Sequence, residues 1–264
     1  MIEYRLKNMP SMLLELLEEL GTFIATEEFK NETTYIFYSE DMLDDILLMF
    51  NVEFSKKNVA ETGWQDKWKE FIKEGWLNKS IYYIFERKLF TDNRKTILIN
   101  PALAFGTGTH GTTKIAANLI EDICNGNTFL DIGTGSGILS IAASILGADK
   151  VYAFDIDKVA MNNCKENIEN NNIHNICLFC SDINSINQQC RFDVVCANII
   201  SSVLLEIKDR VSKIAKDYII FSGILISEYD EVIKELIPDN WLIDKKIEID
   251  EWCGVRLING SSNR

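Results

Sequence analysis

The sequence predicts an α/β protein in which a doubly wound sheet follows a small α+β domain. Strand-like and helix-like segments alternate beyond residue 128, a pattern typical of a parallel sheet covered by helices. A glycine-rich turn joins the first of these strands to its helix, at the place where such sheets bind ligands. The first 60 residues follow a different order of elements, so we expect a separate unit there.

The N-terminal unit has the order β-α-β-β-α-β, which predicts a split-βαβ or ferredoxin-like arrangement. We expect strands at Ile2 to Lys7, Phe23 to Phe29, Thr33 to Ser39 and Val52 to Ala60, with helices at Ser11 to Leu20 and from Asp41. Residues 1–60 carry five Lys or Arg against twelve Asp or Glu, a net charge of −7 out of −13 for the whole chain. This balance suits a basic partner, and a generally acidic proteome explains it equally well.

A linker helix is expected over residues 63–80, because Trp64, Trp68 and Phe71 recur at helical spacing. Beyond it, two strands lead into a loop of small residues from Pro101 to Gly111, and the doubly wound sheet follows. The expected strands are Ile81 to Glu86, Thr96 to Asn100, Thr128 to Ile132, Val151 to Asp155, Ile176 to Cys180, Phe192 to Ala197, Tyr218 to Ser222, Trp241 to Ile249 and Val255 to Ile258, with helices from Ile138, Val159, Val203 and Glu228. The last two strands are too close for a crossover helix and should pair antiparallel. The domains are therefore 1–62, 63–80 and 81–264.

Composition excludes several classes of protein. No run of about 18 apolar residues and no secretory leader is present, so we expect a cytoplasmic protein without a membrane. The net charge of −13 argues against direct binding of nucleic acid. Seven scattered cysteines suit reduced thiols in the core. Cys177 and Cys180 form a C-x-x-C pair, but the sequence has no second C-x-x-C or histidine pair to complete a zinc site, so no metal is expected.

The segment from Asp131 to Gly137 carries the chemistry. Glycines at 133, 135 and 137 let the backbone approach a nucleotide-like ligand closely. A dinucleotide site needs the third glycine one position further on, and an acid at Asp131 would repel a diphosphate. The same acid suits the positively charged methionine part of S-adenosylmethionine, which we predict as the cofactor.

Three further side chains follow strand ends. Asp155 lies about twenty residues beyond the glycines, where a carboxylate accepts hydrogen bonds from both ribose hydroxyls. Asp182 ends the next strand, facing adenine or serving as a turn residue. Asn198 ends the strand after that, where its amide oxygen would hold a substrate amine toward the methyl group. A helix-capping role is the alternative for Asn198.

The two histidines have different surroundings. His174 lies among asparagines in an expected loop and reads as a surface residue. His110 lies inside the small-residue loop, where it could act as a general base or make a hydrogen bond that organises the loop.

These motifs together resemble the PrmA family, the methyltransferases of the eleventh protein of the large ribosomal subunit. The resemblance rests on Asn100 to Thr113, Leu130 to Leu139, Asp155 to Asp157, Ala197 to Ile199 and Phe221 to Leu225. It implies a mobile N-terminal recognition domain, a linker helix and a seven-stranded, Rossmann-like methyltransferase domain. It also implies methylation of lysine side chains and an N-terminal amine, with cofactor contacts at Thr107, Thr113, Gly133, Asp155 and Asn198.

We therefore predict an S-adenosylmethionine-dependent protein-lysine methyltransferase, monomeric, with a ribosomal protein as substrate. Asn198 is the predicted catalytic residue; the cofactor residues are Thr107, Thr113, Asp131, Gly133, Gly135, Asp155, Asp182 and Asn198. A methyltransferase of the same family that acts on another protein or a small molecule is the alternative. A dehydrogenase-like module is disfavoured by Asp131 and the glycine spacing, and a relic scaffold by the intact Asp155 and Asn198.

Overall fold

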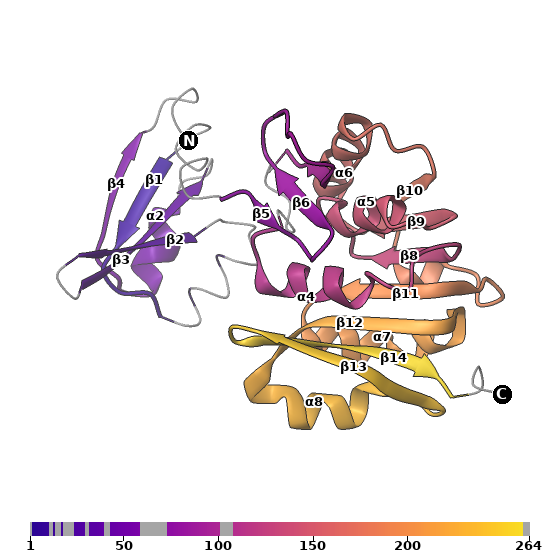
Figure 1. The fold of residues 1–264 in the computed structure, drawn as a ribbon. Coiled ribbons are helices and arrows are strands. Elements are labelled where there is room, and N and C mark those ends of the chain that lie inside the picture. Colours follow the sequence, from indigo (N-terminus) through magenta and orange to yellow (C-terminus); the bar gives the residue numbers. More distant parts are fainter. Residues whose placement is uncertain are drawn as a thin grey trace. The chain divides into compact units, whose positions relative to one another are not determined.

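The computed structural model describes residues 2–10, 13, 17, 24–29, 32–39, 43–58, 73–100 and 108–260. The chain divides into two compact units, Met1–Lys73 and Glu74–Arg264 (Figure 1). Each unit has its own sheet and its own buried core.

The first unit is an antiparallel sheet with strand order β2-β3-β1-β4. Its elements are β1 Ile2–Leu6, β2 Ile24–Phe29, β3 Glu32–Ser39, α2 Asp44–Met49 and β4 Phe54–Asn58. Tyr4 and Leu6 point into its core because alternate residues of a strand share a face. On the opposite face the buried Glu3 pairs with Arg5 and with Lys57 of the neighbouring strand. The four predicted strands are confirmed to within about two residues at their ends.

The two helices expected in this unit have different outcomes. The helix predicted from Asp41 is present and begins at Asp44. The helix predicted over Ser11 to Leu20 lies mostly outside the described residues. Within it the structure describes Leu13 and Leu17, and both are buried. Their spacing of four residues matches one face of a helix.

The linker helix predicted over residues 63–80 is wrong in its last part; residues 63–72 lie outside the described residues. Strand β5, Gly75–Trp76, occupies residues within that range and pairs with Tyr82 and Tyr83. The Asn78 side chain then accepts hydrogen bonds from the N–H groups of Ser80 (2.9 Å) and Ile81 (2.8 Å). An asparagine that binds the backbone two and three residues ahead forms a turn, so the chain bends there instead of continuing as a helix.

The second unit begins with a three-stranded sheet in the order β5-β6-β7. Strand β6, Ile81–Ile84, pairs antiparallel with β5 and parallel with β7, Lys95–Leu98. Helix α4, Gly111–Leu119, follows and was not predicted. Its first residues, a glycine and two threonines, are weak helix formers, which is why they read as part of the preceding loop.

The main sheet has seven strands in the order β10-β9-β8-β11-β12-β14-β13. Neighbours from β10 to β12 run parallel, whereas β14 is antiparallel to both β12 and β13. The predicted sheet and its antiparallel end are therefore confirmed. Its elements are β8 Thr128–Ile132, α5 Ile138–Ile145, β9 Lys150–Asp155, α6 Lys158–Asn170, β10 Ile176–Cys180, the short helix Ile183–Ser185, β11 Phe192–Asn198, α7 Ser201–Ile214, β12 Ala215–Leu225, the short helix Ile226–Glu228, α8 Tyr229–Leu236, β13 Trp241–Ile249 and β14 Trp252–Asn259.

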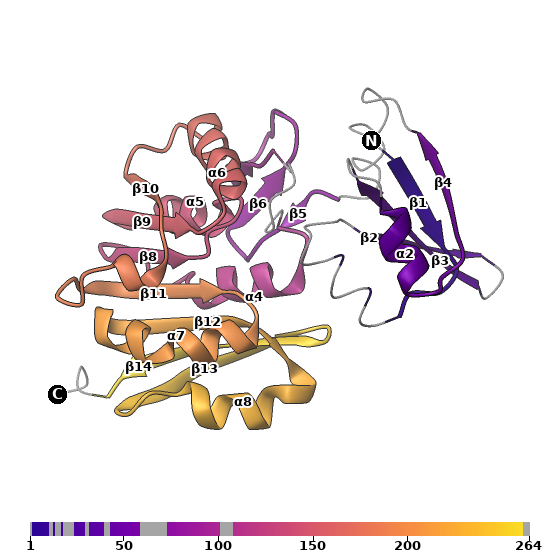
Figure 2. The same ribbon diagram turned by 180° about the vertical axis from the view of Figure 1, so that it is seen from behind.

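Helices cover both faces of this sheet, as Figures 1 and 2 show from opposite sides. Val194 and Cys196 of β11 pack into the core beneath α4, α5 and α6. Val195 and Ala197 of the same strand pack beneath α7 and α8. A strand buried on both faces reads as a continuous apolar run, which explains the sequence from Val194 to Ala197.

Candidate active site

Five of the predicted site residues lie at the carboxyl ends of β8, β9 and β11: Asp131, Gly133, Gly135, Asp155 and Asn198. Strand β8 lies between β9 and β11 in the sheet, so the chain moves outward to one side from β8 to β10 and returns to the other side at β11. Such a switch point leaves a crevice at the carboxyl ends of the strands, where ligands bind in open α/β sheets.

The loop between β8 and α5 needs its glycines. Gly133, Gly135 and Gly137 have φ angles of 67°, 54° and 83°, which residues with a side chain rarely adopt. A Cβ on Gly137 would also come within 2.5 Å of the Cys164 sulfur on α6. The loop backbone therefore lies tightly folded over the end of β8 with no side chain of its own at three positions.

Asp131 is buried beneath this loop, near the end of β8. Its Oδ2 accepts hydrogen bonds from Thr134 Oγ1 at 2.7 Å and from Ser140 Oγ at 2.6 Å. Burial, with a smaller contribution from the charge of Asp155, raises the pKa of Asp131 to about 6, although the hydrogen bonds from Ser140 and Thr134 lower it. A positive group over the loop would stabilise the ionised form of this carboxylate.

Asp155, the last residue of β9, joins the second motif to the glycine loop. Its Oδ2 accepts from the Gly135 N–H at 2.9 Å, and its Oδ1 accepts from the Asp157 N–H at 3.0 Å. A carboxylate has about four acceptor positions, so two remain for a ligand. Asp157 in turn caps α6 by accepting from the Val159 N–H at 2.8 Å.

Asn198 ends β11 and is 7% exposed. Its Nδ2 donates to Thr113 Oγ1 of α4 at 3.5 Å. Among the described residues, its Oδ1 is the buried side-chain polar atom without a hydrogen-bond partner. Helix α7 has Ile200 as its N-cap and no side-chain cap, so the helix-capping alternative for Asn198 is wrong.

The loop after Asn198 lies against β12 because Gly223 permits it. Gly223 has a φ of 99°, and a Cβ there would come within 2.2 Å of the Ile199 carbonyl oxygen. The neighbouring Ser222 donates from Oγ to the Thr112 carbonyl at 2.9 Å. The ends of β11 and β12 and the first turn of α4 thus form one packed cluster.

These residues fit S-adenosylmethionine, as two observations indicate. The orphaned Asn198 oxygen is a buried acceptor of the kind that an amine satisfies. The three glycines with positive φ leave the loop backbone without side chains, so that it can approach a ligand closely. Asp131 and Asp155 add negative charge beside that loop.

The other predicted site residues are placed as follows. Asp182 caps the short helix Ile183–Ser185, accepting from the N–H groups of Asn184 (2.6 Å) and Ser185 (3.2 Å), so it is at least a turn residue. Thr107 lies outside the described residues. His110 is the N-cap of α4, which supports the loop-organising alternative.

Sequence reasoning missed four polar residues of this cluster. Thr134 and Ser140 support Asp131, while Thr112 and Ser222 join α4 to β12. Ser140 had a signal, since it is a polar residue inside the apolar run that opens α5. The contact between Thr112 and Ser222 spans 110 residues and has no local signal.

The cysteines and histidines outside this cluster form no metal site within the described ranges. Cys124, Cys164, Cys196 and Cys253 are buried, but Cys177, Cys180 and Cys190 are exposed. The expectation of core thiols is therefore wrong for those three. Cys177 and Cys180 lie on β10, an edge strand whose side chains reach solvent, and Cys190 lies in the segment before β11. No helix within the described part of the chain is long and apolar enough to cross a membrane.

Comparison with known proteins gives consistent matches. The profile of the family described as "Ribosomal protein L11 methyltransferase (PrmA)" matches residues 15–259. A protein with that name from Thermoanaerobacter pseudethanolicus is 35% identical over 210 residues, 78% of this chain and 68% of the relative. One from Streptococcus pneumoniae is 33% identical over 216 residues, 80% and 68% of the two chains. The crystal structure of a ribosomal protein L11 methylase from Lactobacillus delbrueckii subsp. bulgaricus superposes with a TM-score of 0.65 at 30% identity, covering 70% of this chain and 98% of that one.

Proposed function

This chain belongs to the ribosomal protein L11 methyltransferase (PrmA) family, and we propose that its own substrate is ribosomal protein L11. It is an S-adenosylmethionine-dependent methyltransferase. In the proposed reaction, methyl groups go to lysine ε-amines and to the N-terminal amine of that protein. The choice of an amine as the methyl acceptor rests on Asn198 Oδ1, a buried hydrogen-bond acceptor without a partner at the end of β11.

The chain's own residues divide the work of the reaction. Bound S-adenosylmethionine supplies an electrophilic methyl group on a sulfonium. Asp155 and the glycine loop bind the nucleoside, with Asp155 accepting from the ribose hydroxyls. Thr113 holds the Asn198 amide by accepting from its Nδ2, and Asn198 Oδ1 then accepts from the amine and directs its lone pair toward the methyl group.

The proton of the acceptor lysine must leave before transfer. An unperturbed lysine has a pKa near 10.4, so only a small fraction is neutral at pH 7. Within the described residues Asn198 offers an acceptor but no base, and we assign it orientation only. The rate is therefore expected to rise with pH in the range where the lysine loses its proton.

The N-terminal unit is the proposed substrate-recognition domain, with residues 1–62 in a ferredoxin-like arrangement. The antiparallel order β2-β3-β1-β4 with α2 supports that arrangement. Its five basic and twelve acidic residues in positions 1–60 suit a lysine-rich partner. Such attraction raises the rate of encounter and is screened by salt. We further propose that the enzyme is cytoplasmic and monomeric and that it does not bind nucleic acid directly.

Mass spectrometry of ribosomal protein L11 from cells with and without this enzyme tests the substrate. We expect the protein to gain multiples of one methyl group only when the enzyme is present. Identical masses would overturn the substrate, and labelling of any other lysate protein by the purified enzyme would then identify the acceptor. With L11 below KM, the rate should fall as ionic strength rises from about 0.01 to 0.15 M.

A further inference from the structure

The first turn of α4 is capped by a histidine. His110 has extended backbone angles, and its Nδ1 accepts from the Thr112 N–H at 3.4 Å while lying 2.8 Å from Thr112 Oγ1. Its ring packs on Trp252 with 5.1 Å between centroids. Helix N-caps are usually Ser, Thr, Asp or Asn, and none of those changes its charge near neutral pH as histidine does.

That same turn holds the Asn198 amide. Thr113 Oγ1 accepts from Asn198 Nδ2 at 3.5 Å, and the Thr112 carbonyl accepts from Ser222 Oγ at 2.9 Å. The nitrogen side of the Asn198 amide is thereby fixed on α4, which leaves the oxygen side for a ligand. The orientation of Asn198 therefore depends on where Thr113 stands.

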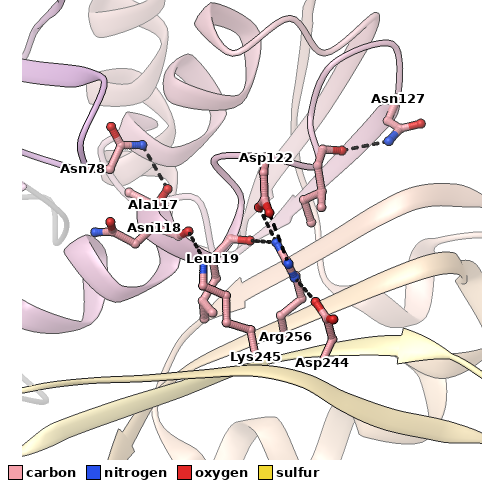
Figure 3. Close-up of polar contacts among 10 residues, drawn as sticks. Asn78, Ala117, Asn118, Leu119, Asp122, Asn127, Asp244, Lys245 and Arg256 are labelled. Carbon is pink, nitrogen blue, oxygen red and sulfur yellow. Dashed lines mark hydrogen bonds and ion pairs between the residues drawn. The ribbon is translucent and has the colours of Figure 1, made fainter.

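The opposite end of α4 is anchored independently, as Figure 3 shows. The carbonyls of Ala117, Asn118 and Leu119 accept from three side chains distant in sequence, Asn78 (3.0 Å), Lys245 (3.5 Å) and Arg256 (2.9 Å). Arg256 is itself paired with Asp122 and Asp244. Because this end is held, loss of the cap acts on the first turn, where Thr113 lies.

We propose that His110 is a positioning residue for methyl transfer: its neutral imidazole caps α4 and so keeps Thr113 against Asn198. The inference rests on the proposed methyltransferase reaction, to which it adds a residue that acts through its neighbours. It also requires one tautomer, with the proton on Nε2, because Nδ1 is the acceptor.

Burial lowers the pKa of His110, while the carboxylates of Glu251 and Asp250 on the turn between β13 and β14 oppose that shift. The folded protein therefore favours the neutral ring. The contribution of the neutral cap to stability is complete above the unfolded histidine pKa of about 6.5, and it is lost as pH falls through the lowered pKa of the folded state. Protonation places a hydrogen on Nδ1 and ends its role as an acceptor for the Thr112 N–H.

The test compares His110→Ala with His110→Asn. We expect His110→Ala to lower kcat by roughly fivefold, the effect of one lost cap, with the Kd of S-adenosylhomocysteine changed less than twofold. His110→Asn restores a capping oxygen and should bring kcat back to within about twofold of the wild type. The ratio of wild-type to His110→Asn kcat cancels the titration of the substrate lysine, so we expect this ratio to be flat above pH 6.5 and to fall as the pH drops through the lowered pKa of His110.

Two further measurements separate the inference from the reaction on which it rests. Imidazole nitrogen NMR of the free protein, assigned with His174→Asn since the chain has two histidines, should show the Nε2–H tautomer for His110. Lys245→Met, which removes a contact at the other end of α4, should leave the pH profile unchanged. A Nδ1–H tautomer, or kcat as low in His110→Asn as in His110→Ala, would overturn the positioning role. Absence of methyl transfer by the wild type would instead overturn the proposed function and leave the tautomer result standing.

Discussion

Replacing Asp155 tests the link between the two cofactor motifs. Asp155→Ala removes the acceptor of the Gly135 and Asp157 N–H groups together with the two acceptor positions assigned to ribose. Because the carboxylate is only partly buried, water replaces it at the two backbone groups, and the main loss is in ligand binding. Asp155→Asn keeps one oxygen for Gly135 but loses the charge and one acceptor.

The magnitude follows from the hydrogen bonds lost. A hydrogen bond to a charged group contributes about 1.5 to 3 kcal/mol, which corresponds to a Kd for S-adenosylhomocysteine roughly 10- to 150-fold higher in Asp155→Ala. Asp155→Asn should fall between this variant and the wild type. Isothermal titration calorimetry measures the three Kd values directly.

Asp157→Ala is the matched control for this measurement. It lies two residues further along the same loop and caps α6 through the Val159 N–H, so it should cost about 1 kcal/mol of folding free energy and change the Kd by less than threefold. A Kd for Asp155→Ala within twofold of the wild type would refute the assignment of Asp155 as the ribose acceptor.

Four other changes have definite expected outcomes. The folded pKa of Asp131, about 6, exceeds its unfolded value of 3.8, so the stability that its protonated form contributes is present below pH 3.8 and lost as pH rises through 6. Between those two pH values the free energy of unfolding of Asp131→Asn should therefore rise by about 3 kcal/mol relative to that of the wild type. Urea unfolding at pH 3.5 and 7.5 checks this, and an equal difference at both pH values contradicts it. Asn198→Ala should lower kcat at least tenfold with a smaller change in cofactor Kd, and unchanged turnover in a methylation assay removes it from the mechanism. Gly223→Ala should destabilise the fold by about 3 kcal/mol, because a backbone oxygen lies 2.2 Å from the new Cβ and φ is 99°; an unaltered melting temperature contradicts this. Arg256→Met should cost about 2 to 3 kcal/mol by leaving the Leu119 carbonyl and two carboxylates without their partner, which thermal unfolding measures.

Strands and glycines were the parts of this protein that local sequence could predict. The apolar run from Val194 to Ala197 identifies a strand buried on both faces, because side chains of a strand alternate between faces. The three glycines of the cofactor loop could be recognised because the ability to adopt a positive φ belongs to glycine itself and does not depend on distant residues. The separation of residues 1–60 from the sheet domain followed from a change in the order of elements.

Helix α4 shows why other parts could not be predicted. Its opening residues disfavour a helix, and its last carbonyls are satisfied by side chains at positions 78, 245 and 256. No window of neighbouring residues contains those partners. The expected linker helix failed at its end because the amphipathic pattern stops at Ile72, and the residues after it form strand β5 and then the turn at Asn78.

The sequence by itself determined the order of the strands along the chain, the glycine loop and the acids that follow it, because each of these depends on residues next to one another. Tertiary structure decided what those residues do. Thr113 accepts a hydrogen bond from Asn198 across 85 positions, and the same fold buries the Asn198 oxygen without a partner. A hydrogen bond between distant segments depends on how the whole sheet brings their ends together, so it exists in the fold and in no stretch of the sequence.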